Sequence, residues 1–590
     1  MNPISAQRWY RLVLDRSLGL PLGDIVRVPG ASIINENPTV IRSPENAAPL
    51  LCRVVAQECG AQVVRVDLLG PPAPQNVTYL DFLSPEINDF ARERLAKTPF
   101  QQQGIVYNCV RQGSLIRIDA GGGKTICSIA SATATPGPII FVSSSAGRWH
   151  VSREITRYTS LTEEREEILI LEGEKPIGLP RKLRFVVVTW ELIVPWLDML
   201  LKLKPATVVF DEIHRAQSAK RSKAVPLPTQ IQIGSDGQPL PVIQRFRRED
   251  LRNTASAVRK ISRATRRRIG LSATPIRDRI RNLWAPLDIL DPKGWGWYSQ
   301  FTRSYCSAAE GSHGWDDTGK SGTRELAERL QHLVYEVPRA VSHAELPSSR
   351  SEVIYLPVSQ QNAPSGGWKN DPELKELRSQ MRQNPSALLE LALRKAASVK
   401  RDFICDRVSE AVAEKQKVVI YTGRRKDVDA WAHKLKEKLK GVPVWAGHGG
   451  VSDRERDRMA SEYMETKEAA VLVCTGYSMG QSIELQTTDL MIFAQLPWSP
   501  GDLKQWMGRA TRKGQDRPVL WFFVVAIATA DERVAQVLIR KIEDVYDVWG
   551  DSEDKQHARA LMGLGDPDKV LDSMVAKLAE DPRIKMGDFG

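Results

Sequence analysis

With 590 residues, of which 42% are hydrophobic and 26% charged, the chain is typical of soluble globular proteins with more than one domain. This composition excludes a collagen, a disordered chain and a disulfide-rich miniprotein. The 83 basic residues outnumber the 71 acidic ones and give a net charge of +12. Such an excess favours a polyanionic partner, although a soluble enzyme that happens to be basic explains it equally well.

Cysteine usage and hydropathy indicate where the protein works. The seven cysteines are scattered and form no CxxC pair, which favours reduced thiols over disulfides or a zinc site. The N-terminus lacks an apolar signal core, and the longest apolar run, 519–530, is shorter than the roughly 20 residues of a membrane helix. We therefore expect no membrane association and a cytoplasmic protein of a bacterium or of a virus that infects one, with a nuclear protein as the alternative.

The chain order of the predicted elements divides the sequence into five parts. Residues 1–88 contain short β-like runs and Pro-rich joints, and predict a small α+β accessory domain with room for a protein partner. From 89 to 283, and again from 401 to 545, β-branched runs alternate with helical patterns, which predicts an α/β fold with two lobes, each a parallel sheet covered by helices. Residues 546–590 are expected to form a helical tail.

Two segments interrupt this alternation. Strand-like patterns on both sides of Gly234–Gly237 predict a hairpin over 229–246, the first part of an insertion at 226–268 within the first lobe. Residues 284–400 are rich in Trp and Leu, and we expect a mostly helical protrusion and linker between the two lobes.

A glycine-rich loop follows the apolar run SLIRID, and a helix-like sequence follows the loop. Its residues are Gly121, Gly122, Gly123, Lys124 and Thr125. Glycines let backbone N–H groups approach a phosphate, the lysine reaches the β- and γ-phosphates, and the threonine hydroxyl binds Mg²⁺. The pattern predicts an ATP site with Mg²⁺. A Gly-rich turn beside a solvated lysine is the alternative, because Ile118 stands where the strict motif has glycine.

A pair of carboxylates, Asp211 and Glu212, comes directly after the apolar run at 207–210. An aspartate there can hold Mg²⁺, and the adjacent glutamate can orient and deprotonate an attacking water. The alternative is a helix N-cap. We expect His214 to link this site to the next strand, whose end carries the coupling residues Ser272, Ala273 and Thr274.

Three further polar side chains fit an ATPase built from two lobes. The amide of Gln101, upstream of the glycine-rich loop, can read both a donor and an acceptor of adenine. In the second lobe, Arg509 and Arg512 are three residues apart, and we expect them on one helical face together with Gln505. Arginine suits a transferring phosphoryl group, as a finger from a second lobe. A solvated basic helix is the alternative.

A strongly basic segment, 245–268, holds ten basic and two acidic residues. Basic side chains neutralise phosphates and release counterions whatever the base sequence. We therefore predict that Arg266, Arg267 and Arg268 contact the DNA backbone, with a solvated helix face as the alternative.

The ordered set of motifs resembles superfamily 2 helicases and translocases, and within them the Swi/Snf helicase-like group. The stretches PFQQQGI, DEIHRAQSAKRSKA and QWMGRATRKGQ carry this resemblance, and FTRSYCSAAEGSHGWDDTGKSGTRELAERL is similar to the HARP-like annealing-helicase branch. It implies two RecA-like lobes, an ATPase that uses ATP and Mg²⁺, and DNA as the partner. It departs from the group in AGGGKT, in Ser482 and in Glu484.

Other contacts are implied only by the resemblance. Trp149, Thr189 and Thr475 would lie near the tracked DNA strand, and Gly480 would couple the lobes. For Trp149, a packed, half-buried tryptophan is the alternative.

We expect an ATP-dependent translocase that remodels duplex or branched DNA by annealing or fork regression. Three alternatives remain open: a strand-separating DNA or RNA helicase, the motor subunit of a restriction or defence complex, and a nucleic-acid-binding scaffold with an inactive ATPase.

Overall fold

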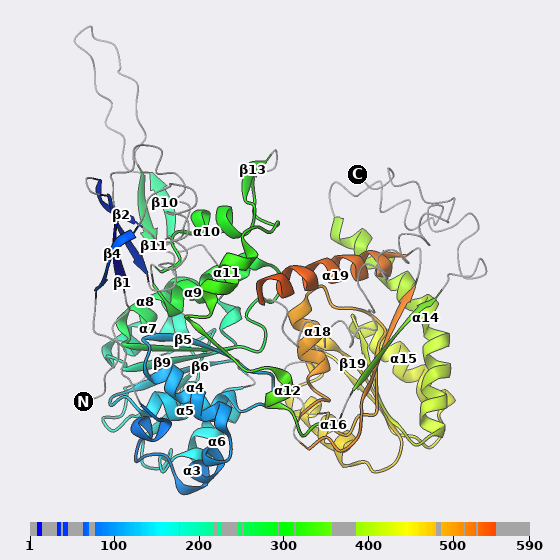
Figure 1. Ribbon diagram of the computed structural model, residues 1–590. Helices are drawn as coiled ribbons and strands as arrows, with labels where there is room; N and C mark the ends of the chain where they lie inside the picture. Colours follow the sequence, from blue (N-terminus) through cyan, green and yellow to red (C-terminus); the bar gives the residue numbers. More distant parts are fainter. Residues whose placement is uncertain are drawn as a thin grey trace. The chain divides into compact units, whose positions relative to one another are not determined.

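The computed structural model describes residues 77–549 and, before them, the backbone of four strands. Gaps in this range lie at 146, 176–177, 217–221, 227–245, 251–252, 293, 312–313, 348, 357–384, 480–484, 513 and 527–528. The chain divides into two compact units, drawn in Figure 1: residues 1–118 with 123–337, and residues 119–122 with 338–590.

The four N-terminal strands form an antiparallel sheet in the order β2-β3-β1-β4. They are β1 (Trp9–Leu14), β2 (Ser32–Glu36), β3 (Thr39–Pro44) and β4 (Val63–Leu69). The sequence anticipated strands here, and the boundary of an accessory domain at residue 88 stays a prediction.

The first unit is built on a seven-stranded sheet in the order β15-β5-β12-β9-β6-β8-β7, in which every pairing is parallel. Its strands are β5 (Gly113–Arg117), β6 (Ile139–Ser143), β7 (Ile168–Ile170), β8 (Phe185–Thr189), β9 (Thr207–Asp211), β12 (Arg267–Leu271) and β15 (Val334–Glu336). Strands β6, β8 and β12 are buried along their whole length, as expected for a sheet that is covered on both faces. The predicted parallel sheet is confirmed.

Helices cover both faces of this sheet. Figure 1 shows α4, α5 and α6 on one side and α8 and α9 on the other. The helices of the unit are η1 (Tyr79–Phe82), α3 (Asp89–Ala96), α4 (Pro99–Cys109), α5 (Lys124–Thr133), α6 (Arg148–Tyr158), α7 (Ile193–Lys202), η2 (Ile213–Arg215), α8 (Thr254–Ala264), η3 (Ile280–Leu283), α9 (Trp284–Leu290), α10 (Tyr298–Tyr305) and α11 (Thr323–Leu330).

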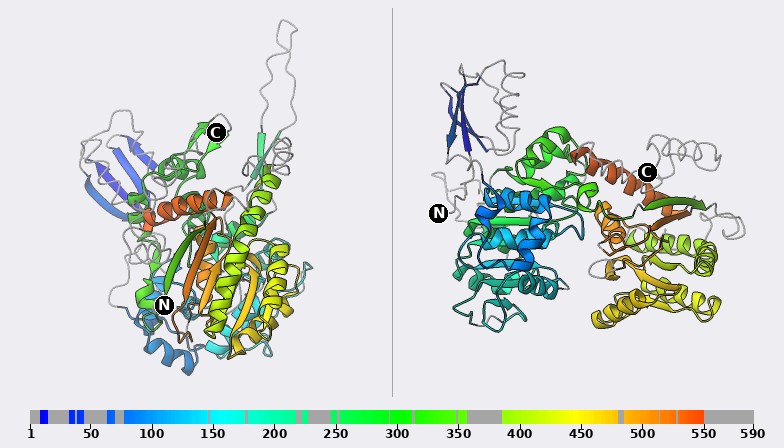
Figure 2. Two further views of the ribbon diagram at one scale, coloured as in Figure 1. Left: turned by 90° about the vertical axis from the view of Figure 1, so that its right-hand side faces the viewer. Right: turned by 60° about the horizontal axis from the view of Figure 1, so that its bottom comes forward.

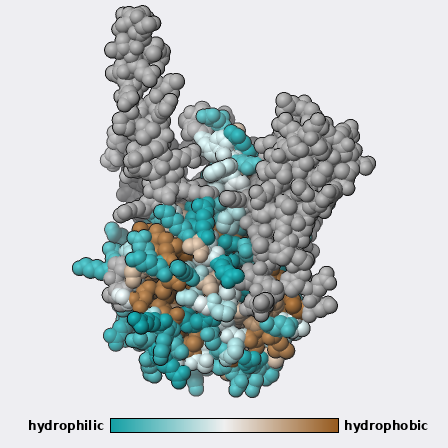
Figure 3. Space-filling model, turned by 90° about the vertical axis from the view of Figure 1, so that its left-hand side faces the viewer, coloured by the Kyte–Doolittle hydropathy of each residue, from teal (hydrophilic) through white to brown (hydrophobic). Residues whose placement is uncertain are grey.

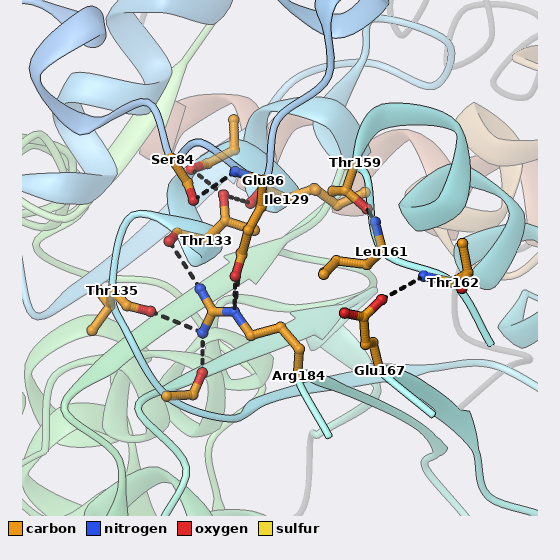
Figure 4. A network of polar contacts seen from close by, with 12 residues as sticks. Ser84, Glu86, Ile129, Thr133, Thr135, Thr159, Leu161, Thr162, Glu167 and Arg184 are labelled. Carbon is orange, nitrogen blue, oxygen red and sulfur yellow. Dashed lines mark hydrogen bonds and ion pairs between the residues drawn. The ribbon is translucent and has the colours of Figure 1, made fainter. Parts of the chain in front are cut away.

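One partly buried guanidinium fixes the C-terminal end of α5, the helix that starts at the glycine-rich loop. Arg184 donates to the carbonyl oxygens of Thr133 and Thr135 at 3.0 and 3.1 Å, and to that of Gly137 (Figure 4). Its Nε also contacts the Glu86 carboxylate at 2.9 Å. Carbonyl groups at a helix C-terminus lack intrahelical partners, so this cation satisfies them and stabilises the helix.

The second unit contains a six-stranded sheet, again entirely parallel, in the order β16-β21-β20-β17-β19-β18. Its strands are β16 (Arg350–Leu356), β17 (Lys417–Thr422), β18 (Val444–Gly447), β19 (Ala470–Thr475), β20 (Leu490–Phe493) and β21 (Leu520–Ala526). Its helices are α12 (Arg339–Ser342), α14 (Pro385–Ala413), α15 (Arg425–Lys438), α16 (Asp453–Glu465), α17 (Gly476–Met479), α18 (Pro500–Met507) and α19 (Ala530–Trp549). The left view of Figure 2 shows β16 in green beside β21 in orange.

The segment expected to be a helical connection contributes strands to both sheets. β15 pairs with β5 in the first unit, and β16 pairs with β21 in the second. Sequence periodicity missed both, because β15 has only three residues and β16 is an edge strand that is mostly half-buried. The segment also carries a short hairpin, β13 (Ala309–Gly311) with β14 (Gly314–Asp316).

The predicted insertion at 226–268 is described in part. Strands β10 (Ser222–Pro226) and β11 (Phe246–Asp250) pair antiparallel and flank the expected hairpin, which itself lies outside the described residues. Residues 550–590 of the expected tail also lie outside them.

The surface and the buried thiols agree with the composition. Figure 3 shows hydrophobic patches among hydrophilic residues on the side it displays, an ordinary mixture for a soluble protein surface. Cys109, Cys127, Cys306, Cys405 and Cys474 are buried and form no disulfide. Over the part of the chain that the structure describes, no helix combines the length and apolar character of a membrane span.

Candidate ATP site and nucleic-acid contacts

The glycine-rich loop connects β5 to the N-terminus of α5. Gly123 is the N-cap of α5 and has a left-handed φ of 86°, which glycine adopts without strain. A Cβ at this position would lie 2.2 Å from Gln101 Nε2, so the Gln101 side chain packs directly against the loop, and its contact with adenine stays a prediction. The backbone N–H groups of the first turn of α5, which includes Thr125, are available to a phosphate.

The loop lysine is already turned back over the loop. Lys124 Nζ donates to the carbonyl oxygen of Ile118 at 2.8 Å, across the segment that contains Gly121 and Gly122. Gly121 also has a positive φ of 86°, and the Gly122 N–H donates to Asp119 O at 3.1 Å. The chain therefore makes a tight turn here that a side chain at Gly121 would strain.

The two carboxylates lie at the end of β9. Asp211 is its last residue and accepts a hydrogen bond from Ser143 Oγ at 3.3 Å. Burial and, to a smaller extent, the charge of Glu212 raise the pKa of Asp211 to about 6, although the charge of Lys124 opposes the rise. The lysine ammonium and the aspartate carboxylate therefore lie within electrostatic reach of each other.

Strand order explains why residues far apart in sequence meet here. In the sheet β12 lies between β5 and β9, and the strands run parallel. The glycine-rich loop, the carboxylates and Ser272 all follow the carboxyl ends of these three strands. In open parallel sheets, ligands bind at this edge.

His214 connects the carboxylates to the end of β12, as predicted. Its Nδ1 lies 3.1 Å from Glu212 Oε2 and 3.0 Å from Ser272 Oγ, and the ring is 3% exposed. Ser272 Oγ in turn accepts a hydrogen bond from the Thr274 N–H at 3.1 Å. With Ala273 between Ser272 and Thr274, these contacts form a continuous path from the Glu212 carboxylate to the segment after β12.

Two contributors to this site were not singled out in the sequence. Ser143, the last residue of β6, binds the Asp211 carboxylate. Trp190, just after β8, donates from Nε1 to Asp211 O at 3.1 Å and stacks on Phe210 with ring centroids 6.0 Å apart. Ser143 ends β6 and Trp190 follows β8, and both strands lie on the same side of β9. Their position at strand ends was the sequence signal that could have identified these two residues.

The acidic residues fit a magnesium ion that arrives with ATP. Among the described residues, no group of three or more His, Cys, Asp and Glu side chains could enclose a metal ion. Mg²⁺ is usually held by one or two carboxylates together with substrate phosphates, rather than by an all-protein cage. Asp211, beside Lys124 and at the carboxyl end of β9, is such a carboxylate.

The arginines of the second unit differ in local structure from the prediction. Helix α18 contains Gln505 but ends at Met507, so Arg509 and Arg512 lie in the turns that follow and not on a helical face. Both arginines nevertheless act electrostatically on the same group, the Tyr421 hydroxyl. Burial raises the pKa of Tyr421, and the positive charges of Arg509 and Arg512 oppose that rise. The turn is fixed by a hydrogen bond from Arg512 Nε to Gly508 O at 3.2 Å.

The residues placed near DNA by resemblance have different exposures. Trp149 is 47% exposed at the start of α6, with the Arg148 guanidinium 5.3 Å from the centroid of its ring. Thr189 and Thr475 are only 2% and 7% exposed, and the Thr475 hydroxyl bonds to Ser478, so the placement of these two threonines does not favour a direct contact. Gly480 lies outside the described residues.

The prediction for the basic segment is wrong at two of its three arginines. Arg267 and Arg268 are 1% and 7% exposed on β12. Arg267 donates to Ser131 O at 2.9 Å and to Cys109 O at 3.0 Å, so it ties β12 to α4 and α5 and cannot reach a phosphate. Only Arg266 is exposed. A run of three arginines in the sequence does not show which of them lie on a strand and are covered by neighbouring helices.

Comparison with known families assigns two domains. Residues 246–399 match the SNF2-related domain, and residues 399–514 match the helicase conserved C-terminal domain. Together they cover β12 and β15 of the first parallel sheet and every strand of the second except β21.

Similar proteins have names from DNA remodelling. A Drosophila melanogaster protein named SWI/SNF-related matrix-associated actin-dependent regulator of chromatin subfamily A-like protein 1 is 23% identical over 84% of this chain and 60% of its own length. The Mus musculus DNA annealing helicase and endonuclease ZRANB3 is 25% identical over 80% of this chain and 42% of its own. The chain thus spans about half the length of these relatives.

One solved structure aligns with most of the chain at low identity and with a low TM-score. The Sulfolobus solfataricus SWI2/SNF2 ATPase core in complex with dsDNA is 17% identical, with 82% of this chain and 99% of that chain covered. The TM-score is 0.35, which is a weak overall superposition.

Proposed function

We propose that the chain, in which residues 246–399 match the SNF2-related domain and 399–514 the helicase conserved C-terminal domain, is an ATP-driven translocase on duplex DNA that remodels branched DNA by annealing or fork regression. Its two domains are those of a DNA-dependent ATPase with two RecA-like lobes. The annealing part of the proposal is supported by relatives whose name is DNA annealing helicase.

The observation that carries the proposal is the cluster at the ends of β5, β9 and β12. Lys124 and the N-terminus of α5 would bind the β- and γ-phosphates, and Thr125 and Asp211 would hold Mg²⁺. The ion would neutralise charge on the transferring phosphoryl group. Glu212, held beside His214, would accept a proton from the attacking water.

Arg509 and Arg512 would supply positive charge in the transition state. Their guanidinium groups lie near one buried hydroxyl, that of Tyr421, in the second unit. A planar guanidinium matches the geometry of phosphoryl oxygens better than a lysine does. Gln505, at the end of α18, would support the same segment.

DNA contacts in this proposal are independent of sequence. Exposed Arg266 would neutralise a backbone phosphate, and Trp149 would lie against the strand. The proposal further includes a protein partner at residues 1–88 and a cytoplasmic setting.

The test compares ATPase activity with no nucleic acid, single-stranded DNA, duplex, forked DNA and RNA. We expect duplex and forked DNA to stimulate hydrolysis more than single strands or RNA do. An ATP-dependent displacement of a third strand from a triplex, with a simple tailed duplex left mostly paired, would separate tracking from unwinding.

The control is Glu212→Gln in the same assays, which keeps the DNA-binding surfaces and removes hydrolysis. Efficient unwinding of the tailed duplex without triplex displacement would instead identify a strand-separating helicase. Absence of stimulation by every nucleic acid would contradict the proposal as a whole.

A further inference from the structure

A small hairpin projects from the first unit and carries an exposed tryptophan. Strands β13 and β14 pair in register from Ala309–Asp316 to Gly311–Gly314, and all three residues of β13 are exposed. Figure 1 shows β13 extending beyond α10 and α11. Trp315, on β14, is 37% exposed, unlike the large buried aromatic residues beneath it such as Trp295 and Tyr305.

A cationic side chain contacts the tryptophan ring. The Arg303 guanidinium of α10 lies 5.1 Å from the centroid of the Trp315 ring, at cation–π distance. Because Trp315 is 37% exposed, part of the ring remains accessible to solvent. A nucleobase that stacked there would complete a layered arrangement of base, indole and guanidinium.

The base of the hairpin is held rigidly. Asp317, directly after β14, is 6% exposed and is bound by Arg281 from η3 and by the hydroxyl of Tyr298 from α10. Arg279 donates to Thr318 O at 2.8 Å. The Tyr298 ring packs edge-on against Trp284 of α9, with centroids 5.3 Å apart, and α9 packs on the sheet at β12 and β5.

This anchor joins the hairpin to the ATP-coupling segment. Arg281 follows Thr274 by seven residues, and Thr274 is bonded to Ser272 at the end of β12. A displacement of the segment after β12 would therefore be transmitted to the hairpin through the ion pair between Arg281 and Asp317, whose carboxylate is buried. An element that is exposed, aromatic and rigidly mounted is suited to pressing against a base step.

The exposed charge on and around the hairpin is mixed. The hairpin itself carries Glu310 and Asp316, and these partly offset exposed Arg303, Lys320 and Arg324 nearby in sequence. Such a mixed surface offers little to a polyanion, whereas stacking needs only a π face. The ligand that fits is an unstacked base, which is present where duplex DNA opens into single strands.

From these observations we propose that Trp315 on the β13–β14 hairpin stacks on a base at the junction between duplex and single strands, and so directs the enzyme to branched DNA. This inference rests on the proposed function, because it names the DNA structure that the motor selects. Stacking against an aromatic side chain corresponds to about 5- to 150-fold in dissociation constant per base.

The experiment uses the full chain and measures binding to a synthetic fork, to fully paired duplex and to single-stranded DNA by fluorescence anisotropy, each over a range of salt. We expect Trp315→Ala to weaken fork binding by 5-fold or more, to leave duplex binding unchanged and to keep the slope of affinity against salt. Trp315→Phe should retain most of the fork affinity. A 2-aminopurine at the junction should be quenched by the wild type and not by Trp315→Ala.

The matched control is Trp297→Ala, which removes another exposed tryptophan, 67% exposed and at the N-terminus of α10. It should bind forks as the wild type does. Equal losses from both variants, or an unchanged fork affinity of Trp315→Ala while the wild-type ATPase responds to DNA, would overturn the inference alone. A wild-type ATPase that ignores all DNA would overturn the proposed function instead.

Discussion

Glu212 adopts a left-handed backbone conformation with a φ of 51° at the turn after β9. Non-glycine residues rarely occupy this region, and those that do cluster at functional sites. The turn directs the Glu212 carboxylate toward His214 and away from a continuation of the strand. A side chain whose position depends on an uncommon backbone conformation is poorly replaced, even by a close analogue.

We predict that Glu212→Gln binds ATP with nearly normal affinity and stops hydrolysis, since only the proton acceptor is lost. Lys124→Ala should instead remove most of the nucleotide binding. Equilibrium binding of a fluorescent ATP analogue and steady-state ATPase assays measure the two effects separately. Turnover near the wild-type rate in Glu212→Gln would show that another group activates the water.

The elevated pKa of Asp211 predicts an unusual dependence on pH. Its folded-state pKa of about 6 exceeds the ordinary 3.8, so the folded protein binds more protons than the unfolded chain between these values. Stability of the nucleotide-free protein should fall as pH rises through this window, and the full penalty is present above about pH 6.

Asp211→Asn removes that penalty, which is on the order of 1–3 kcal/mol. We expect it to raise the Tm of the nucleotide-free protein at pH 7.5, with the gain shrinking toward pH 4, while ATP hydrolysis is lost. Calorimetry across this range is the measurement. Asp198→Asn, on the exposed side of α7, is the control and should change little. A Tm gain that is the same at every pH would contradict the electrostatic cause.

At the scale of elements, the two parallel sheets show how much of the fold the sequence predicts. The alternation of apolar runs and helical patterns predicted the parallel sheets, because strands buried on both faces are continuously apolar. The positions of the glycine-rich loop with Lys124 and of the pair Asp211 and Glu212 at the carboxyl ends of β5 and β9 were predictable for the same reason, and their roles in ATP hydrolysis stay predictions.

Lateral contacts were not predictable. Arg267 looks like its neighbour Arg266 in the sequence, and only the packing of α4 and α5 against β12 decides which one is buried. Similarly, β15 and β16 have no distinctive hydrophobic periodicity. They form strands because they pair with β5 and β21 at the edges of the two sheets. The turn with Arg509 and Arg512 was taken for helix because spacing alone does not show where α18 ends.

Arg266, just before β12, and Arg267, its first residue, should therefore respond in opposite ways. Arg266→Ala should reduce the log–log salt dependence of duplex binding by about 0.9 and leave the Tm unchanged. Arg267→Ala should leave carbonyl oxygens of Cys109 and Ser131 without their donor and lower stability by about 2–4 kcal/mol. Salt titrations and thermal unfolding test the pair, and a salt effect from a still-folded Arg267→Ala would contradict the burial.

For the whole molecule, catalysis should depend on both units. Lys124, Asp211 and Glu212 belong to the first unit, and Arg509 and Arg512 to the second. If the arginines act in the transition state, Arg509→Ala and Arg512→Ala should lower kcat by on the order of 10³-fold with little change in ATP affinity. Gln515→Ala, nearby on the same segment, serves as the control for misfolding. Equal losses of binding and turnover would indicate a structural role.

The connecting segment contributes one strand to each parallel sheet, and this determines where the chain can be divided into two fragments. Every strand of the first parallel sheet lies before residue 337, and every strand of the second lies after residue 349. A break in the backbone between β15 and β16 would thus interrupt neither sheet. This segment is therefore the place to divide the chain into a split enzyme, in which two fragments are made separately and activity is restored by tethering them. The boundaries at 283 and 401 that hydropathy indicates are not suitable for this purpose. Fragments divided at those boundaries would each leave an edge strand with the wrong partner.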